Sequence, residues 1–241
     1  MNRFLFLGCF ILISFHGFAS KILIPMDDSQ ANHLKAYGVT FWVLGNGVEA
    51  QWLLNYRGGS FMLPNINNIA EECVIRGVSF QVIADVQAAQ ILNEISDSEV
   101  NMESVKLEKS PKIAVYSPAG KLPWDDAVTL VLTYAEIPYE IVYDEEVLSG
   151  VLPKYDWLHL HHEDFTGQFG KFYKAYRTAA WYQDEVDSQN ASASFMGFQK
   201  VSEMKREVSL TLRNFVLGGG FLFTMCSGTD SFDIALAAQN V

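Results

Sequence analysis

Cysteine is scarce in this 241-residue chain, which contains only three. Cys9 lies in an N-terminal segment that we expect to be removed, so Cys73 and Cys226 remain in the mature protein. Two cysteines cannot build the disulfide framework of a small secreted scaffold. A bridge between them would also consume the thiol of Cys226, which follows a short apolar run and precedes a Ser-Gly pair. Any thiol chemistry of this protein therefore depends on Cys226.

Basic residues are also few. The chain has 17 lysines and arginines against 28 aspartates and glutamates, which gives a formal net charge of −11. Proteins that bind nucleic acid rely on basic patches for much of their affinity, and attraction to anionic lipid likewise needs clustered positive charge. We therefore expect neither nucleic acid nor electrostatic docking on lipid. The expected partner is a small-molecule substrate or ligand, and the oligomeric state stays open.

The longest apolar run, Phe4 to Phe15, is too short to span a membrane as a helix. Arg3 supplies positive charge before this run, and Gly17-Phe18-Ala19 places small residues at the −3 and −1 positions of a cleavage site. This is the pattern of a secretory signal peptide. We therefore predict a signal peptide at 1–20, with the mature chain starting at Ser20 or Lys21. The protein would be exported to the periplasm or the extracellular space, without stable membrane insertion.

Strand-like apolar runs alternate with helix-like amphipathic segments along the mature chain. This alternation predicts an α/β protein with a mostly parallel sheet between two layers of helices, a three-layer arrangement. The polar and charged segment at 96–111 divides the chain into two successive α/β halves, residues 21–110 and residues 111–241. Gly45-Asn46-Gly47 matches a dinucleotide-binding fingerprint only superficially, because helix rather than strand is expected before it.

Hydrophobic periodicity predicts the elements of each half. In the first half we expect strands at 21–25, 51–56 and 78–84, and helices from about Ser29, at 65–76 and at 86–95. In the second half we expect strands at 112–116, 141–143 and 155–161, and helices at 124–136 and 202–216. Asp125 or Asp126 would lie near the start of the 124–136 helix.

The most informative segment follows the helix expected at 202–216. Gly218-Gly219-Gly220 ends that helix, Phe221 to Thr224 forms a short apolar run, and Cys226-Ser227-Gly228 makes a turn of small residues. A strand, a tight turn and a following helix are the parts of a nucleophile elbow, here with cysteine as the nucleophile. The helix N-terminus behind the thiol would favour the thiolate. The alternative is an inert buried cysteine, which is common at strand ends.

In the catalytic interpretation Cys226 is the nucleophile and the backbone N–H of Ser227 is one donor to the oxyanion. A second donor would come from the loop after the third strand, near Gly167. Asp230 and Asp233 resemble an N-cap and its first-turn partner, which makes the following helix a poor site for phosphate.

A histidine-rich segment, His159-Leu160-His161-His162-Glu163-Asp164, precedes Gly167. Strand alternation would put His159 and His161 on one face and His162 on the other. His161, His162, Glu163 and Asp164 are residue types that bind metals. Known sites of this kind draw ligands from several segments, and no matching cluster occurs elsewhere in the sequence. We therefore expect these four residues to form a pocket beside Cys226, with no metal or other cofactor.

Aromatic residues are concentrated between the third strand and the helix at 202–216. They are Phe165, Phe169, Phe172, Tyr173, Tyr176, Trp181 and Tyr182. Phe169, Phe172, Tyr173 and Tyr176 recur at helical spacing, which favours a helix that faces the core. The alternative is an exposed surface that binds sugars or covers a pocket.

On the glycine run, the apolar strand and the Cys-Ser-Gly turn, the second half resembles the class I glutamine amidotransferase-like (flavodoxin-like) fold over roughly residues 112–241. The resemblance implies that Cys226 attacks a glutamine amide and forms a thioester. It also implies a histidine base, a carboxylate that orients it, and two backbone amides that bind the oxyanion. The family has glycine where this chain has Thr224, and its His-x-Glu pair lies well downstream of the cysteine. The base is therefore not identified in this chain, which we expect to be truncated at its C-terminus.

The whole chain also resembles a group of exported bacterial proteins that carry Lys-Ile-Leu-Ile-Pro-Met-Asp, Leu-Leu-Asn-Tyr-Arg-Gly-Gly-Ser-Phe and His-Leu-His-His-Glu-Asp-Phe-Thr-Gly. Members are often labelled asparagine synthetase B, glutamine-hydrolysing. Residue 2 of this chain is asparagine rather than a nucleophilic cysteine, and no phosphate-binding loop is visible. These residues do not support a synthetase activity.

Three functions follow from these patterns. The first is a thiol amidohydrolase that acts through Cys226. The second is a non-catalytic module on the same fold that binds a small molecule or a glycan. The third is metal-assisted hydrolysis at His161, His162, Glu163 and Asp164.

Overall fold

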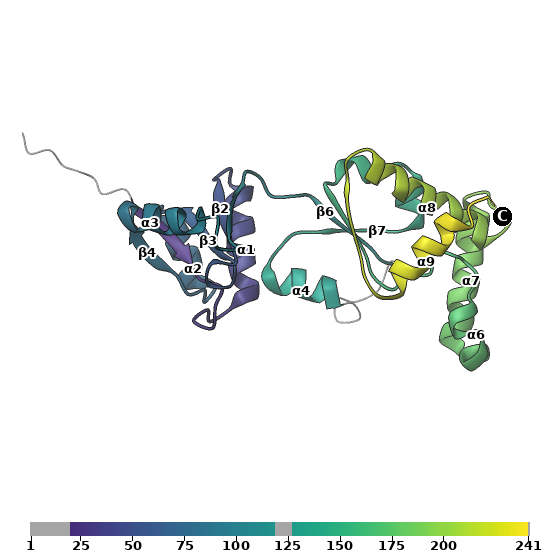
Figure 1. The fold of residues 1–241 in the computed structure, drawn as a ribbon. Helices are drawn as coiled ribbons and strands as arrows, with labels where there is room; N and C mark the ends of the chain where they lie inside the picture. The colour runs from purple at the N-terminus through teal and green to yellow at the C-terminus, as the bar shows by residue number, and fades with distance from the viewer. Residues whose placement is uncertain (1–19, 119–126, 241) are drawn as a thin grey trace, which may run out of the picture. The chain divides into compact units, whose positions relative to one another are not determined.

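The computed structural model describes residues 20–118 and 127–240 (Figure 1). Residues 1–19 of the expected signal peptide and the two candidate N-terminal aspartates of a helix, Asp125 and Asp126, lie outside the described residues. Ser20, the last residue of the predicted signal peptide, is the first residue of the first strand. The chain divides into two compact units, the first running to Glu108 and the second starting at Lys109. Each unit combines one sheet with helices, so the protein is α/β.

The N-terminal unit contains a five-stranded sheet. Its strand order is β4 (Gln81–Ala84), β1 (Ser20–Ile24), β3 (Ser60–Pro64), β2 (Ala50–Leu54) and β5 (Glu103–Leu107). All four pairings are antiparallel, so the prediction of a mostly parallel sheet is wrong for this unit. Sequence reasoning missed β3 and β5. Only the short turn Asn55–Gly59 separates β2 from β3, and neighbouring strands joined by so short a turn must be antiparallel.

Helices cover both faces of this sheet, which gives the unit three layers. On one face α3 (Asp85–Ile95) packs through Ala88 and Ile95 on Leu23, Leu53 and Met62. On the other face α1 (His33–Gly45) contacts the sheet through Tyr37, whose ring meets the edge of Phe61 at 5.5 Å. The third helix, α2 (Asn67–Ile75), buries Ile69 and Cys73.

The C-terminal unit contains a four-stranded parallel sheet, as the strand and helix alternation predicts for this half. The strand order is β7 (Glu140–Val142), β6 (Ile113–Tyr116), β8 (Trp157–Leu160) and β9 (Phe221–Thr224). All three pairings are parallel. The chain moves outward from β6 to β7 and then returns past β6 to β8 and β9. This reversal creates a switch point at the carboxyl ends of β6 and β8, where ligands bind in sheets of this kind.

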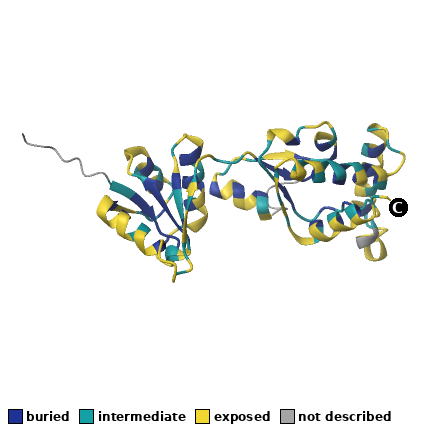
Figure 2. Ribbon diagram, turned by 45° about the horizontal axis from the view of Figure 1, so that its top comes forward, coloured by how far each residue is buried: buried dark blue, intermediate teal, exposed yellow. Residues whose placement is uncertain are grey.

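Right-handed crossovers that run in opposite directions place their helices on opposite faces of a sheet. They put α4 (Ala127–Ala135) on one face, and α5 (Asp144–Leu148) and α8 (Val201–Leu217) on the other. The helix after β9 is α9 (Cys226–Ala237), and it shares the core of α5 and α8. Figure 2 shows the buried residues of this unit on the sheet and on the helix faces turned toward it. The core includes Tyr116, Leu158, Leu160, Val208, Leu212 and Ala235.

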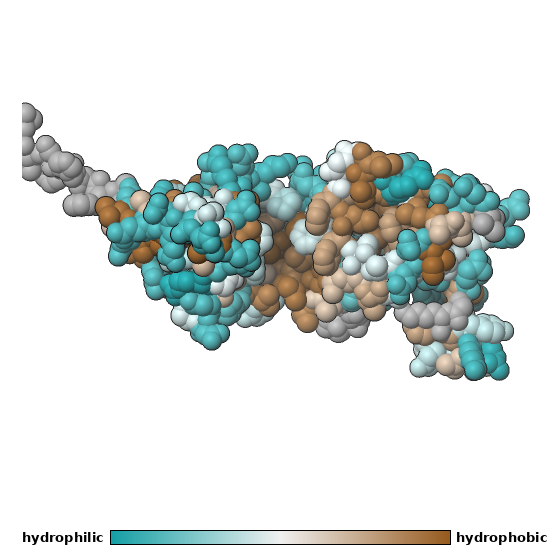
Figure 3. Space-filling view, in the orientation of Figure 1, coloured by the Kyte–Doolittle hydropathy of each residue, from teal (hydrophilic) through white to brown (hydrophobic). Residues whose placement is uncertain are grey.

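The exposed hydrophobic residues of this unit include two groups that matter for the site and its surroundings. The first is the edge strand β9, where Phe221 is 60% and Phe223 47% exposed, and Figure 3 shows hydrophobic surface over this side of the unit. The second is a helical hairpin made of α6 (Gly170–Tyr176) and α7 (Ala180–Phe195), which projects from the body of the unit (Figure 1). The prediction of a core-facing helix is therefore wrong for Phe172, Tyr173 and Tyr176, which are exposed on this hairpin. Phe169, which precedes α6, does pack on the buried cluster of Ala193, Val201 and Met204.

Candidate functional site

Cys226 is the first residue of α9, directly after β9 and Met225. Its φ is +53°, in the left-handed region that side chains other than glycine rarely adopt, whereas Met225 is extended. The side chain is exposed. A strained turn that joins a strand to a helix and presents one side chain to solvent is the backbone arrangement of a nucleophile elbow. The fold thus places the thiol at the carboxyl end of the parallel sheet.

Three hydrogen bonds hold the loop after β8 against the first turns of α9. The backbone N–H of Gly228 donates to the carbonyl oxygen of His161 at 2.9 Å. The hydroxyls of Ser227 and Ser231 donate to the carbonyl oxygens of His162 and Glu163, at 3.0 Å and 2.8 Å. Three consecutive carbonyls therefore fix the position of the loop beside Cys226.

Gly228 is required by this close approach. A Cβ atom at this position would lie 2.2 Å from the carbonyl oxygen of His161, well inside van der Waals contact. Thr224 stands where the resembling family has glycine, and its hydroxyl accepts a hydrogen bond from the hydroxyl of Thr229 at 3.1 Å. The turn therefore accommodates a β-branched residue two positions before the cysteine, while glycine two positions after it is indispensable.

The helix after the elbow begins earlier than the sequence suggested. Because α9 starts at Cys226, Asp230 is not its N-cap and Asp233 is not in its first turn, so both predictions are wrong. In an α-helix the first N–H groups have no acceptor within the helix. The N–H of Ser227 is one of these groups, which suits the oxyanion role predicted for it.

A hollow of about 320 Å³ lies between the loop after β8 and α9. Its lining residues are Glu163, Asp164, Thr166, Gln168, Ser227, Asp230, Ser231 and Ile234. The structure thus brings Glu163 and Asp164 to one hollow with Ser227, but the other members of the predicted pocket, His161, His162 and Cys226, do not line it. A second hollow of about 350 Å³ shares Thr166, Gln168 and Ile234 with the first and adds Arg206 and Glu203 of α8.

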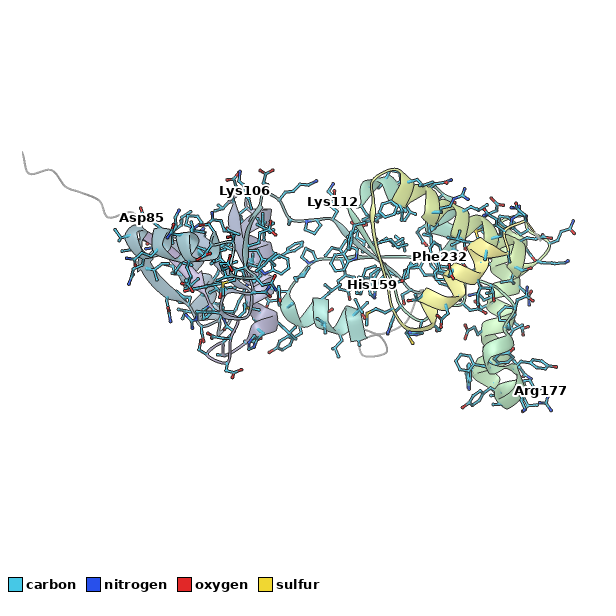
Figure 4. All side chains as sticks on the ribbon, viewed as in Figure 1. Asp85, Lys106, Lys112, His159, Arg177 and Phe232 are labelled. Atoms are coloured by element: carbon cyan, nitrogen blue, oxygen red, sulfur yellow. The ribbon has the colours of Figure 1, made fainter. Side chains whose placement is uncertain are left out.

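The three histidines take different positions. His159 is buried within β8 (Figure 4), where its ring stacks on Phe223 with centroids 5.7 Å apart. His161 and His162 follow the end of the strand, and their Nδ1 atoms lie 2.9 Å apart. The main chain of both residues bonds to the start of α9, which places their backbone beside the elbow.

Among residues 20–118 and 127–240, no group of three or more histidine, cysteine, aspartate or glutamate side chains is arranged to hold a metal ion. The two carboxylates of the predicted ligand set are turned toward protein donors. Glu163 accepts from the Tyr143 hydroxyl at 3.4 Å. Asp164 accepts from the N–H and the hydroxyl of Thr166, at 2.8 Å and 2.6 Å. The arrangement of this loop does not support metal-assisted hydrolysis.

Gly167 lies on the side of this loop that faces α8. Its φ is +63°, and a Cβ atom there would lie 2.9 Å from the backbone of Val201 and Ser202, so glycine is required for the loop to reach the helix. Its neighbours Thr166 and Gln168 line the hollow that Ser227 also lines. The assignment of Gly167 as the second oxyanion donor stays a prediction.

A buried network of polar side chains lies next to the loop that follows β8. Lys205 of α8 and Asp144 of α5 are each 2% exposed or less and form an ion pair with 2.7 Å between Nζ and Oδ2. The Tyr116 hydroxyl donates to Asp144 and accepts from Lys205 at 3.0 Å. Tyr116 ends β6 and Asp144 follows β7, so this network lies at the same end of the sheet as Cys226.

Tyr143 connects the network to the loop after β8. Its ring lies 4.6 Å from the Lys205 ammonium, and its hydroxyl accepts from Gln189 at 2.5 Å and donates to Glu163. Burial, together with nearby carboxylates, raises the pKa of the Tyr116 and Tyr143 hydroxyls, so both stay protonated and can donate. The network therefore reaches Glu163, which is adjacent to His162.

Sequence reasoning missed this network, although one signal was present. On α8 the buried apolar side chains Val201, Met204, Val208 and Leu212 form one stripe, and Lys205 lies within it. A lysine inside an apolar stripe must be paired when it is buried. Its partner could not be read from the sequence, because Asp144 is 61 positions away.

Comparison with protein-family models, with curated proteins and with solved structures finds no match for this chain. The resemblance to the class I glutamine amidotransferase-like fold therefore rests on the residues quoted from the sequence and stays a prediction.

Proposed function

We propose that the C-terminal unit is a thiol amidohydrolase that acts on a small-molecule amide in the periplasm or outside the cell. The observation that carries this proposal is the left-handed backbone of Cys226, exposed where β9 meets α9. A residue other than glycine in this conformation costs about 1–2 kcal/mol. Strain of this kind persists where the surroundings enforce it, and it clusters at functional sites.

In the proposed reaction the Cys226 thiolate attacks the amide carbonyl carbon and forms a C–S bond. The carbonyl oxygen becomes an oxyanion, which accepts a hydrogen bond from the N–H of Ser227. When the C–N bond breaks, the leaving nitrogen takes a proton and departs as ammonia or an amine, leaving a thioester. Water then attacks the thioester, the C–S bond breaks, and the products are a carboxylic acid and the original thiol.

His161 and His162 are the proposed proton carriers. A histidine removes the thiol proton and returns it to the leaving nitrogen, the usual division of work between a nucleophile and its base. Support comes from the hydrogen bonds that fix both residues beside the first turn of α9. The Lys205 network supports the same loop through Tyr143 and Glu163, so its members are positioning residues in this proposal.

The test uses Cys73 as an internal control. Cys73 is fully buried, and burial raises the pKa of its thiol to about 11. We expect iodoacetamide at neutral pH to label Cys226 at least about 100-fold faster than Cys73, because the thiolate is the reacting form. Incubation with glutamine and other small amides should release ammonia, which Cys226→Ala abolishes and Cys73→Ala preserves.

Labelling of Cys226 no faster than in the denatured chain would contradict the proposal. Replacing His161 or His162 by asparagine separates the roles further. The variant that lacks the base should release no ammonia, while its melting temperature should change little.

A non-catalytic binding module is the second candidate, favoured by the two adjoining hollows beside α9. Thermal-shift screening against amino acids and glycans distinguishes the two. Stabilisation that survives Cys226→Ala, in a protein that releases no ammonia from any amide, would favour binding over hydrolysis.

A further inference from the structure

The tip of the α6–α7 hairpin is aromatic and exposed. We define the hairpin tip as Phe172, Tyr173, Lys174, Tyr176, Arg177 and Trp181. Its four rings are between 42% and 58% exposed, and Lys174 and Arg177 are exposed as well. Figure 4 shows Arg177 at the far end of the projecting hairpin. The tip thus presents aromatic and basic side chains together to solvent.

The rings of the tip pack on one another. Trp181 contacts Tyr176 at 5.2 Å and Phe172 at 5.8 Å, and Phe172 contacts Tyr176 at 6.0 Å. Their planes cross at 56°, 78° and 70°. These three rings therefore form a rounded cluster rather than one flat platform, and stacking of a sugar ring needs a flat aromatic face.

The charge of the tip is opposite to that of the chain. Residues 165–183 contain Lys171, Lys174 and Arg177 and not one aspartate or glutamate, in a chain with 28 acidic residues. Acidic residues resume at Asp184 and Glu185, further along α7 toward the body of the unit. Salt screens charges that are separated by more than about 8 Å at physiological ionic strength. What the tip attracts therefore depends on the charges near it rather than on the net charge of −11: Lys174 and Arg177 within the tip, with Asp184 and Glu185 about one helical turn after Trp181.

We propose that the hairpin tip docks on the surface of an anionic phospholipid membrane. Tryptophan and tyrosine combine an apolar ring with a polar edge and favour the membrane–water interface. Lysine and arginine beside them are attracted to anionic headgroups. The docking is peripheral, since none of the helices in the described residues is long and apolar enough to cross a membrane. The expectation from average charge, that anionic lipid is not a partner, is revised for this segment alone.

The first experiment is hydrogen–deuterium exchange on the full chain with vesicles of equal parts phosphatidylglycerol and phosphatidylcholine. We expect amides in peptides that cover residues 170–182 to exchange several-fold more slowly when these vesicles are added. Vesicles of phosphatidylcholine alone should have little effect. The apolar segment Phe4–Phe15 is present throughout, but it reports in different peptides and so cannot produce this protection.

The second experiment changes the charge of the tip. Each basic residue near an anionic surface strengthens binding roughly five-fold. Lys174→Glu with Arg177→Glu should therefore raise the lipid concentration for half-maximal hairpin protection at least about 25-fold. Trp181→Ser should raise it as well, through loss of the ring. The matched control, Lys154→Glu with Lys200→Glu, reverses two exposed lysines away from the tip and should leave it unchanged. Unchanged melting temperatures confirm that each variant is folded.

Three results would overturn the proposal. The first is anionic vesicles that leave the hairpin peptides unprotected. The second is equal protection by neutral vesicles, and the third is undiminished protection in the Lys174→Glu, Arg177→Glu variant. Hairpin protection by an acidic soluble protein but not by vesicles would assign the tip to a protein partner instead.

Discussion

The two units use left-handed backbone in different ways. In the N-terminal unit the turn between β2 and β3 has four residues with positive φ, namely Asn55, Arg57, Gly58 and Gly59, at 61°, 47°, 80° and 94°. In the C-terminal unit Cys226 has a similar φ at the junction of β9 and α9. The difference between the two sites lies in what the strained residue's side chain contacts.

In the β2–β3 turn the strained residues are bonded to the loop after β1. The carbonyl of Arg57 accepts from the N–H of Met26 at 3.0 Å, and its guanidinium donates to Asp27 at 2.7 Å. At Cys226 the neighbouring residues make the bonds, through Ser227 and Gly228, while the thiol itself is exposed. The strained residues thus join two loops in one unit and present an exposed thiol in the other.

The largest effect is expected at the two ion pairs. Lys205–Asp144 is buried, whereas the side chains of Arg57 and Asp27 are 28% and 35% exposed. Lys205→Met should destabilise the C-terminal unit by about 3–5 kcal/mol, because it leaves Asp144 charged and unpaired. Arg57→Met should cost about 1 kcal/mol or less through its ion pair. Hydrogen exchange, followed in peptides of each unit separately, measures the loss of stability in both variants. Recovery of stability in Lys205→Met with Asp144→Leu is the control, and equal losses in the two single variants would contradict the comparison.

The glycines that permit close approach come next. Gly58→Ala would place Cβ 2.3 Å from the Met26 carbonyl oxygen, and Gly228→Ala would place it 2.2 Å from that of His161. Overpacking of this kind typically costs about 1–3 kcal/mol. Gly58→Ala also forces an alanine into left-handed backbone, which adds strain. Gly197→Ala is the matched control, because φ is +86° there with nothing within 4 Å, so it reports strain without a clash. Chemical denaturation of the three variants should rank Gly197→Ala as the mildest. Of the three variants, only Gly228→Ala should also change the rate at which iodoacetamide labels the Cys226 thiol.

A smaller effect of opposite sign is expected at the strained side chains themselves. Cys226→Gly should stabilise the C-terminal unit by about 1 kcal/mol, because glycine adopts left-handed backbone without a Cβ penalty. Arg57→Gly relieves the same strain but removes the ion pair to Asp27, so we expect no gain. Melting temperatures test this directly. If Cys226→Gly lowered the melting temperature, the thiol would be holding the elbow together rather than being presented by it.

The smallest effect concerns pH. Hydrogen bonds from Arg57 and Ser29 hold the pKa of Asp27 well below its usual range. Its contribution to stability is therefore complete above the unfolded pKa of about 4 and disappears as pH falls through the lower folded value. Asp27→Asn should make the free energy of unfolding of the N-terminal unit depend less on pH under acidic conditions. The pH dependence of the C-terminal unit should stay unchanged. If the stability of this variant depended on acidic pH as strongly as that of the unmodified protein, other carboxylates would be responsible for the pH dependence.

Much of the C-terminal unit could be predicted, because its signals are local. An apolar strand, small residues and a helix around Cys226 are contiguous in the chain, and the structure joins them in the expected order, although the strand is an exposed edge and not a buried one. The N-terminal sheet was harder to predict. Ser60–Pro64 follows two glycines and ends in proline, and Glu103–Leu107 is rich in charge, so neither has the composition of a typical strand.

The sequence by itself determined the α/β class, the parallel strands of the second half and the position of a candidate nucleophile at the end of one of them. Periodicity and turn residues encode these features locally. The tertiary structure alone decided the antiparallel direction of the first sheet, the left-handed backbone of Cys226, the pairing of Lys205 with Asp144 and the exposure of the hairpin tip. Each of these depends on groups far apart in the chain, and only their packing sets which backbone approaches closely and which side chains leave water.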